Sequence, residues 1–347
     1  MRGVAVAAVA LVAVLAVAAA SAGEAKTPIS VRVLTRNLYL GANLDAIVQA
    51  KSAQEAFAAV ERGWGDVQAN NFPVRARAIA REIAATKPDF VGMQEVSLYR
   101  TQAPADFTVT PATTVALDYV RELRKAFAAR KLHYRFLGIN SATDAELPAG
   151  DPPAMDIRLT IRDALLVRID PKIKIRSVRK GLYTTTTPLF GGFVTAKRGW
   201  VYADASIAGR RFRVVTTHLE SFNNTSQVAQ GQELAAGPAS TSLPTILLGD
   251  LNSRADGTGT PTQANLLAAG FQDAWPQAHP GEIGLTCCHS DDLREFGGPF
   301  YSRIDYVLVR NGFRATAAGI VGEKPQDRLA GLWPSDHAGV WARLRLP

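Results

Sequence analysis

The sequence predicts an α/β fold in which helices pack outside largely antiparallel β-sheets. The first half of the chain alternates strand-like runs with amphipathic helical patterns. The later half is mostly short strand-like runs that follow each other directly, with turn residues between them. The sequence has no internal repeat, no heptad pattern and no low-complexity linker.

The expected elements of the first half begin with the strand ISVRVLTRN, which ends at Asn37. PDFVGMQE is a short buried strand that ends at Glu95, and LDYVRELRKAFAARK predicts an amphipathic helix. Residues 101–114 are Pro/Thr-rich and are expected to form a loop, and TDAELPAGDPPAMD has the composition of a long surface excursion. The other helical patterns cover residues 44–50, 52–70 and 74–86.

The second half is expected to supply most of the strands. They are ALLVRID, KIKIRSV, GWVYADASI, RFRVVTTH, TILLGD, IDYVLVR and GVWARLRL. The chain has 347 residues, of which 47% are hydrophobic and 20% charged, and a single large α/β domain accounts for it as well as two small ones.

Residues 1–22 differ from the rest of the chain. Arg2 is followed by a Val/Ala/Leu run and then by Ala20, Ser21 and Ala22, which have the small-x-small form of a signal peptidase site. We expect a secretory signal peptide at 1–22, a single mature domain at 23–347 and a secreted or extracytoplasmic location. An N-terminal membrane anchor is the alternative, although the run is short and Ala-rich for a bilayer crossing.

The net charge and the two cysteines give weaker indications of function. Lys and Arg exceed Asp and Glu by 39 to 31, and a formal charge of +8 favours polyanionic partners such as nucleic acids or acidic lipid surfaces. Cys287 and Cys288 are neighbours, with Cα atoms about 3.8 Å apart, closer than in most disulfides. A bridge between them would be strained, and the sequence leaves both redox states open.

Polar residues stand at the ends of six strand-like runs. In an antiparallel sheet the end of one strand lies beside the start of its neighbour, so these residues can gather at one edge of the fold. Each of these residues can also have a purely structural role. It can form an Asx-turn, cap the next segment or, as a buried histidine, make its hydrogen bonds within the protein. As a set, their carboxylates, amides and imidazoles suit a hard metal ion and a phosphate group. They are Asn37, Glu95, His218, Asp250 with Asn252, Asp305, and Asp336 with His337.

The motifs TRN, MQE, TTHLE, GDLNS, RIDYVLV and SDHAGV, in this order, resemble those of the endonuclease/exonuclease/phosphatase superfamily. That group contains deoxyribonuclease I, abasic-site endonucleases, neutral sphingomyelinases and inositol-polyphosphate phosphatases. The resemblance covers residues 31–347. It implies a four-layer α/β sandwich, with two packed, mostly antiparallel β-sheets flanked by helices.

The resemblance also implies a metal site. Asn37 and Glu95 would hold a divalent cation, with Glu95 as the principal ligand and Asp336 beside the metal. Mg²⁺ is the natural candidate, because it takes few protein carboxylates and keeps positions for water and phosphate oxygen; Mn²⁺ and Ca²⁺ are the alternatives.

Further roles follow by position in the same motifs. Asp250 would orient or deprotonate the attacking water, and Asn252 would donate its amide to a phosphate oxygen. His337, oriented by Asp305, would be a general base or a cationic phosphate ligand. His218 would donate to the phosphoryl oxygens.

The chain departs from the family pattern in two places. Asp163 stands where relatives often carry a small residue, so it either faces the site or pairs with Arg162 or Arg168 in a solvated turn. Cys287 and Cys288 occupy a loop that borders the substrate in relatives, which makes them candidate substrate contacts.

The resulting hypothesis is a secreted, metal-dependent phosphoester hydrolase, more specifically a phosphodiesterase that acts by in-line attack of water. A phosphomonoesterase and a non-catalytic binding protein on the same scaffold are the alternatives. The five histidines are scattered without zinc-hydrolase spacing, and the sequence has no G-x-S-x-G motif and no P-loop.

The expected partner is a phosphate-ester substrate, with no obligate protein partner and a monomeric state. KIKIRSVRK, with Lys172, Lys174 and Arg176 on one face, favours nucleic acid unless it is only a charged edge strand. PLFGGFV, with Phe190 and Phe193 near a turn, favours a phospholipid head group unless it packs in a hairpin.

Overall fold

The structure is a computed structural model that describes residues 28–295 and 300–346. The expected signal peptide at 1–22 lies outside these residues. Among the described residues, no helix has the length and apolar character needed to cross a membrane.

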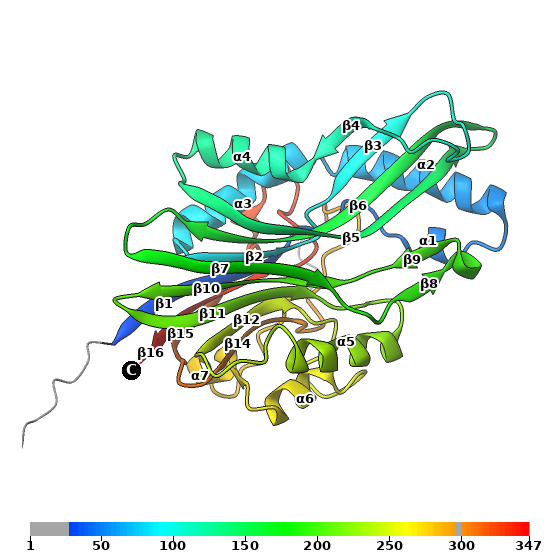
Figure 1. Cartoon of the computed structure of the whole chain (residues 1–347). Helices are drawn as coiled ribbons and strands as arrows, with labels where there is room; N and C mark the ends of the chain where they lie inside the picture. The colour runs from blue at the N-terminus through cyan, green and yellow to red at the C-terminus, as the bar shows by residue number, and fades with distance from the viewer. Residues whose placement is uncertain (1–27, 296–299, 347) are drawn as a thin grey trace, which may run out of the picture.

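Two large β-sheets form the centre of the fold, as Figure 1 shows. The eight-stranded sheet has the order β15 (Arg314–Val321), β16 (Gly339–Leu346), β1 (Ile29–Asn37), β2 (Phe90–Gln94), β6 (Pro153–Arg168), β3 (Leu98–Gln102) and β4 (Thr114–Asp118), with β5 (Tyr134–Gly150) also paired to β6. The six-stranded sheet has the order β13 (Gln272–Asp273), β14 (Asp305–Arg310), β12 (Thr245–Asp250), β11 (Arg210–His218), β10 (Gly199–Ile207) and β7 (Ile173–Leu182). A small hairpin pairs β8 (Thr187–Leu189) with β9 (Val194–Ala196).

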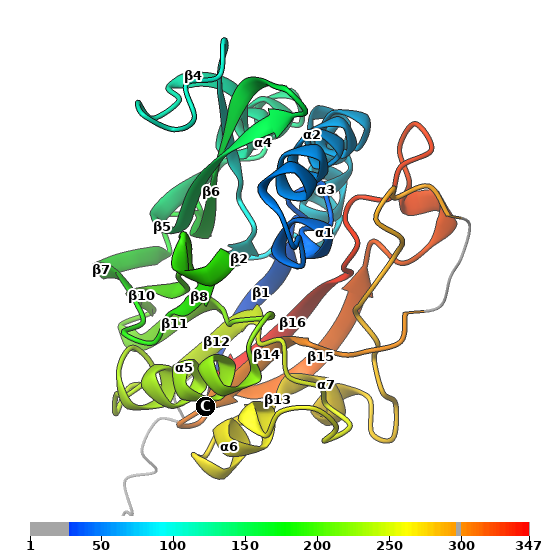
Figure 2. The same ribbon diagram turned by 90° about the vertical axis from the view of Figure 1, so that its right-hand side faces the viewer.

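Helices cover the outer faces of both sheets (Figures 1 and 2). The eight-stranded sheet carries α2 (Ala53–Ala69), α3 (Phe72–Thr86) and α4 (Tyr119–Ala129), and the short α1 (Asp45–Val48) precedes them. The six-stranded sheet carries α5 (Asn224–Ala236) and α6 (Thr262–Ala268), with α7 (Ala274–Ala278) next to β14 and β15. Short 3₁₀ turns lie at Phe190–Gly192 and Pro325–Asp327.

Strand alternation explains this layering. In β12, Ile246 and Leu248 belong to the core between the sheets, whereas Leu247 belongs to the core under α5 and α6. In β2, Phe90 lies between the sheets and Val91 packs under the helices. Because successive side chains point to opposite faces of a strand, both faces of each sheet are buried. The four-layer α/β sandwich expected from the resemblance is confirmed.

Each sheet is mostly antiparallel but contains one parallel pair. β1 runs parallel to β2, and β11 runs parallel to β12. Helices α1–α3 cross between the first pair and α5 between the second, as parallel neighbours require. These pairs place the carboxyl ends of four strands at the same end of the sandwich.

The sheets approach each other closely near that end. A Cβ added to Gly92 in β2 would lie 2.9 Å from the Leu248 Cβ and would also collide with the Thr216 side chain. Glycine here allows Gln94, two residues further along, to donate to the Thr216 hydroxyl across the gap at 3.1 Å. This contact joins the polar ends of the two sheets.

One expected surface segment is instead part of a sheet. Residues 143–156 were predicted to be a surface excursion, but they form the far ends of β5 and β6, which pair from Tyr134↔Arg168 to Gly150↔Pro153. The prediction was wrong because its Gly and Pro residues mark only the hairpin turn. Ala149 and Ile157, on either side of that turn, are buried in the core under α2.

Candidate active site

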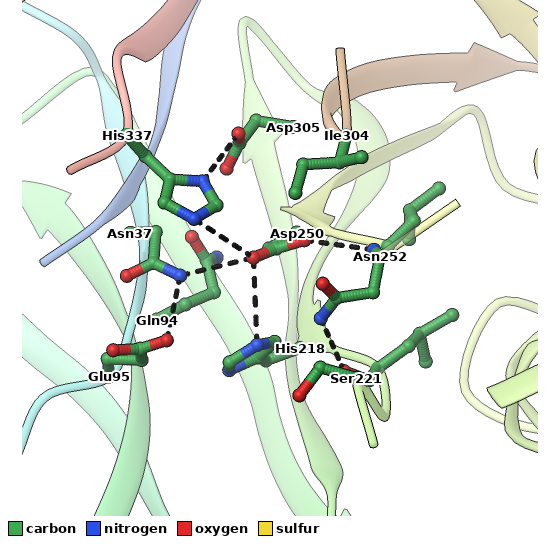
Figure 3. A network of polar contacts seen from close by, with 12 residues as sticks. Asn37, Gln94, Glu95, His218, Ser221, Asp250, Asn252, Ile304, Asp305 and His337 are labelled. Atoms are coloured by element: carbon green, nitrogen blue, oxygen red, sulfur yellow. Dashed lines mark hydrogen bonds and ion pairs between the residues drawn. The ribbon is translucent and has the colours of Figure 1, made fainter. Parts of the chain in front are cut away.

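Strand register brings the predicted polar residues together at one end of the sandwich (Figure 3). His218 pairs with Asp250 across the parallel β11–β12 ladder, and Asp250 pairs with Asp305 across the antiparallel β12–β14 ladder. Asn37 lies opposite Gln94, which precedes Glu95. His337 stands two residues before β16. The site therefore depends on parallel as well as antiparallel pairing.

Asp305, His337 and Asp250 form a buried row. The Asp305 Oδ2 lies 2.8 Å from the His337 Nδ1, and the His337 Nε2 lies 3.9 Å from the Asp250 Oδ2. The His218 Nε2 approaches the same Asp250 oxygen at 3.6 Å. Arg36 donates to the His337 carbonyl and is itself paired with Glu82 at 2.9 Å, which holds the His337 backbone in place.

The two histidines differ in charge. Burial lowers the pKa of His337, but the Asp305 and Asp336 carboxylates outweigh it and raise that pKa well above its usual value. The pKa of His218 is well below its usual value because the ring is buried and lies near Arg198 and His337. His337 is therefore a cation near neutral pH and His218 is neutral.

Asp250 is buried and accepts hydrogen bonds on both of its carboxylate oxygens. The Asn37 Nδ2 donates to its Oδ2 at 3.1 Å, and the Asn252 backbone amide donates to its Oδ1 at 2.9 Å. Burial first, and then the nearby Asp305 charge, raise the pKa of Asp250 to about 7. Such a carboxylate can accept a proton near neutral pH.

Glu95 lies beside this row. The Asn37 Nδ2 also donates to the Glu95 Oε1 at 3.1 Å, and the Leu40 backbone amide donates to its Oε2 at 2.6 Å. Glu95 has a φ of 57°, a strained conformation for a non-glycine residue that is common at functional sites. The Asn37 amide thus bridges the Glu95 and Asp250 carboxylates, while its Oδ1 accepts from the Tyr39 amide.

Asp336 completes the acidic group. Its pKa is raised to about 6, mainly by burial, while His337 lowers it and the Glu95 charge raises it further. The Ser335 hydroxyl donates to its Oδ1 at 3.2 Å.

This donor set fits a hard divalent cation. The cleft is lined by the carboxylates of Asp45, Glu95, Asp250, Asp291 and Asp336, and Arg198 is the one Lys or Arg among its described lining residues. The Oδ1 of Asp305 is buried with no hydrogen-bond partner in the described part of the chain. Asp250, Asp305 and His337 also place ligand atoms within 4.8 Å of one another. Clustered carboxylate oxygens with few cationic partners are what Mg²⁺, Mn²⁺ or Ca²⁺ bind.

Asn252 is fixed by two local hydrogen bonds. Besides the bond from its backbone to Asp250, its Nδ2 donates to the Leu219 carbonyl at 2.9 Å. One amide N–H is engaged by Leu219, and Asn252 is one of the residues that line the cleft.

Asp163 faces the site, and the alternative of a solvated turn is wrong. The side chain is buried, and its Oδ1 lies 3.9 Å from the His218 Nδ1. Arg162 instead binds Asp118, and Arg168 binds Asp89. Burial raises the pKa of Asp163 to about 7, although the Arg198 charge opposes the rise.

The two cysteines lie at the rim of the cleft. Cys288 is half-buried and lines the cleft, whereas Cys287 is buried behind it and is bridged to Ser302 and His337 through the backbone. The structure joins the two sulfurs as a vicinal disulfide. Of the two, Cys288 is the one in a position to touch a substrate.

Arg198 was missed by the sequence prediction. Its Nη1 lies 2.9 Å from the His218 Nδ1, and its Nη2 lies 3.6 Å from the Glu220 carboxylate. The side chain is buried at the base of the cleft. The only local signal was a basic residue directly before the strand GWVYADASI, whose first residue Gly199 pairs with His218.

Comparison with known proteins agrees with this geometry. An endonuclease/exonuclease/phosphatase family protein from Bacteroides thetaiotaomicron has a TM-score of 0.60 at 17% identity, over 92% of this chain and 99% of that chain. Danio rerio TDP2, complexed with a single-strand DNA product, has a TM-score of 0.55 at 17% identity, over 91% and 98%. A mannosyl-6-phosphatase from Bacteroides thetaiotaomicron has a TM-score of 0.57 at 16% identity, over 90% and 99%. At these identities the likeness establishes the fold alone.

Sequence comparison establishes the family. None of the curated proteins compared with the chain matches it. The sequence model of the Endonuclease/Exonuclease/phosphatase family matches residues 63–337, which is most of the chain and includes every predicted site residue except Asn37. The chain therefore belongs to the endonuclease/exonuclease/phosphatase family, whose members hydrolyse phosphate esters.

Proposed function

We propose that the protein is an exported phosphodiesterase that depends on a divalent cation, with Mg²⁺ as the natural ion. The observation that carries the proposal is the buried row of Asp305, His337 and Asp250, with the Asn37 amide donating both to Asp250 at its end and to Glu95 beside it. Hydrolysis of a phosphate ester needs a proton acceptor for water and positive charge near the phosphoryl oxygens. In this row, Asp250 is the proton acceptor and His337 supplies the positive charge.

Each residue has a distinct role in the proposed reaction. Asp250 accepts a proton as the water oxygen bonds to phosphorus, the ester P–O bond breaks, and the leaving oxygen takes up a proton from solvent. His337, kept cationic by Asp305, donates from Nε2 to a phosphoryl oxygen. Arg198 holds the neutral His218 in place beside it.

Glu95, Asn37 and Asp336 would hold the cation. Bound there, it would neutralise charge on the phosphate and its leaving oxygen. The carboxylates that line the cleft and the unpartnered Oδ1 of Asp305 support a site with too much negative charge for its protein partners alone.

The charge of the cleft favours a diester over a monoester. Five carboxylates line it against Arg198 and the cationic His337 among the described lining residues. A monoester is a dianion near neutral pH, whereas a diester has one charge and is repelled less. The mannosyl-6-phosphatase with the same fold makes the monoesterase the second candidate.

The basic strand predicted to favour nucleic acid lies away from this cleft. Lys174 pairs with Ser206 in the β7–β10 ladder, whereas the site end of that ladder is Gly199↔Leu182. None of Lys172, Lys174 and Arg176 belongs to the cleft lining. β7 lies at the edge of the six-stranded sheet, so the segment agrees with the alternative of a charged edge strand. These basic residues therefore do not lead a polyanion to the site.

The expectation of export depends on residues 1–22 alone. Amino-terminal sequencing of the protein recovered from the medium or the periplasm should find a mature chain beginning at Gly23. A chain that retains its first residues and sediments with membranes would favour the anchor.

A substrate panel tests the activity. We expect the mature protein to hydrolyse bis(4-nitrophenyl) phosphate with Mg²⁺ or Mn²⁺, to lose that activity in a chelator and to act less on 4-nitrophenyl phosphate. His133→Ala, which changes an exposed histidine far from the cleft, is the matched control and should behave as the parent. Turnover of monoesters alone would favour the phosphatase, and no turnover would favour a binding protein.

A further inference from the structure

An apolar cavity lies directly beside the active-site cleft. Its volume is about 110 Å³, and its walls come from α1, α2, the β5–β6 pair and the β8–β9 hairpin, which lie at the same end of the molecule in Figure 1. Aliphatic and aromatic side chains dominate these walls. The lining positions used below are Gly63, Ala145 and Leu147.

Two of the polar groups in the lining are satisfied within the protein, whereas the Arg198 Nε, at the boundary with the cleft, is buried without a partner among the described residues. The Tyr99 hydroxyl donates to the Leu40 carbonyl at 2.9 Å, and the Thr143 hydroxyl donates to the Lys197 carbonyl at 2.9 Å. Water needs two to four polar partners to occupy a cavity, and this cavity offers few polar groups. Apolar cavities of about 150 Å³ stay dry and bind small hydrocarbons, so a slightly smaller one suits a short chain or the end of a longer one.

The cavity adjoins the site and shares part of its wall with it. Ala42, Leu44, Ile161, Arg198 and Phe222 line both spaces. Arg198 marks the boundary, because its guanidinium contacts His218 on the side of the site while the same residue lines the apolar wall. A molecule with its phosphate between His218 and His337 can therefore extend a second group past Arg198 into the cavity.

We propose that this cavity binds an apolar chain esterified to the substrate phosphate, so that the substrate is an amphiphilic phosphodiester. The inference rests on the proposed function and names its substrate class. The acidic cleft supports it, because a molecule with one phosphate and an apolar chain suffers less repulsion there than a polyanion does.

Chain length gives the direct test. A series of methyl alkyl phosphodiesters, from methyl to octyl, is followed by phosphorus NMR below the critical micelle concentration of each ester. We expect kcat/KM to rise about fourfold for each methylene that enters the cavity, the factor equivalent to about 0.8 kcal/mol, and then to level off. Equal kcat/KM values along the series would overturn the cavity proposal while hydrolysis itself upheld the proposed function. No hydrolysis of any ester would overturn both.

Three variants locate the effect. Ala145→Leu fills the cavity from a half-buried position on β5, and Gly63→Ala is a milder filling variant, since an added Cβ at Gly63 would lie 3.7 Å from the Ala42 Cβ, an ordinary contact. Both should reduce the ratio of octyl to methyl kcat/KM, the first more strongly. Leu147→Ala enlarges the space and should shift the plateau to a longer chain.

The matched control is Phe193→Ser. Phe193 is 92% exposed near the tip of the β8–β9 hairpin and is absent from the cavity lining. This variant should keep the parental ratio on monomeric esters. An equal loss of the ratio in Phe193→Ser and Ala145→Leu would assign the chain to the outer surface of the hairpin and overturn the proposal.

A last comparison distinguishes binding of a dissolved, monomeric amphiphile in the cavity from binding at a bilayer surface. The octyl ester should be hydrolysed as a monomer, and Ala145→Leu should lower that rate. If chain-bearing esters reacted only in vesicles of phosphatidylglycerol, the apolar group would be held by a membrane surface and not by this cavity.

Discussion

The polar site and the apolar cavity adjoin each other, yet they are built in different ways. The site gathers residues at strand ends, where the register of neighbouring strands places His218, Asp250 and Asp305 side by side. The cavity is enclosed by helices α1 and α2, the β5–β6 pair and the β8–β9 hairpin, which are far apart in the sequence. Strand register aligns part of its wall, such as Ala145 opposite Leu159, but the rest comes from helices and loops packed against it. The chemistry is thus encoded in short motifs, whereas the space for the substrate arises from the packing of the whole chain.

The two regions also differ in what holds them in place. In the site, each carboxylate is fixed by specific donors, such as the Asn37 amide between Glu95 and Asp250. In the cavity, the apolar side chains are held by packing alone. Substitutions in the site should therefore act on turnover with every substrate, and substitutions in the cavity should act on the choice among substrates.

Asp250→Asn should have the largest effect. It removes the proton acceptor but keeps the size and one of the two acceptor oxygens, so kcat should fall by about 10²–10⁴ for methyl and octyl esters alike. Steady-state kinetics on both esters would measure it. A loss of kcat confined to the octyl ester would contradict the distinction between a site that sets turnover and a cavity that sets the choice of substrate.

Asp305→Asn and His337→Ala test the coupling within the row. Removing His337 should lower kcat by about 10²–10³, as loss of one preorganised donor does, and Asp305→Asn should cost less. Because Asp305 acts through His337, the double variant should be no worse than His337→Ala alone. Additive losses would show that the 2.8 Å contact between them does not matter to the reaction.

Arg198→Met tests the boundary between the regions. Arg198 lies 3.6 Å from Glu220, and both side chains are almost fully buried. Removing one partner of a buried ion pair costs about 3–5 kcal/mol of unfolding free energy, which denaturant titration would measure. Adding Glu220→Gln should restore part of the stability but not the turnover. Full recovery of turnover would mean that Arg198 has only a structural role.

The cysteines should matter least. Replacing both Cys287 and Cys288 by Ser should change the free energy of unfolding by no more than about 1 kcal/mol, because a bridge between neighbours closes almost no loop in the unfolded chain. Thermal unfolding of the double variant would measure it. A much larger loss would show that the buried Cys287 is needed for packing beside His337.

Much of the site could be predicted because its residues follow recognisable strands. The apolar run before Asp250 is buried on both sides, so a carboxylate at its end indicated a special position. The structural alternative was also correct in part, since the Asn252 amide makes an Asx-type bond to Asp250 within the same cluster. The two interpretations of that turn do not exclude each other.

Long-range features escaped prediction. Arg198 is one of many basic residues in the sequence, and only the pairing of Gly199 with His218 places it in the site. The β5–β6 extension has the composition of a surface excursion because its Pro and Gly residues interrupt the strand pattern. Ala149 and Ile157, on either side of the turn, are nevertheless strand residues. The cavity depends on that extension, so it could not be predicted from any single segment.

Cation binding at Glu95 is the most direct test of the central claim that the carboxylates form a metal site. Isothermal titration of Mg²⁺ or Mn²⁺ into the mature protein should give one site, with the same Kd in Glu323→Gln, an exposed control. Glu95→Gln keeps the shape but removes the charge, so its Kd should rise at least about tenfold, or about 1.4 kcal/mol. An unchanged Kd in Glu95→Gln would contradict the account.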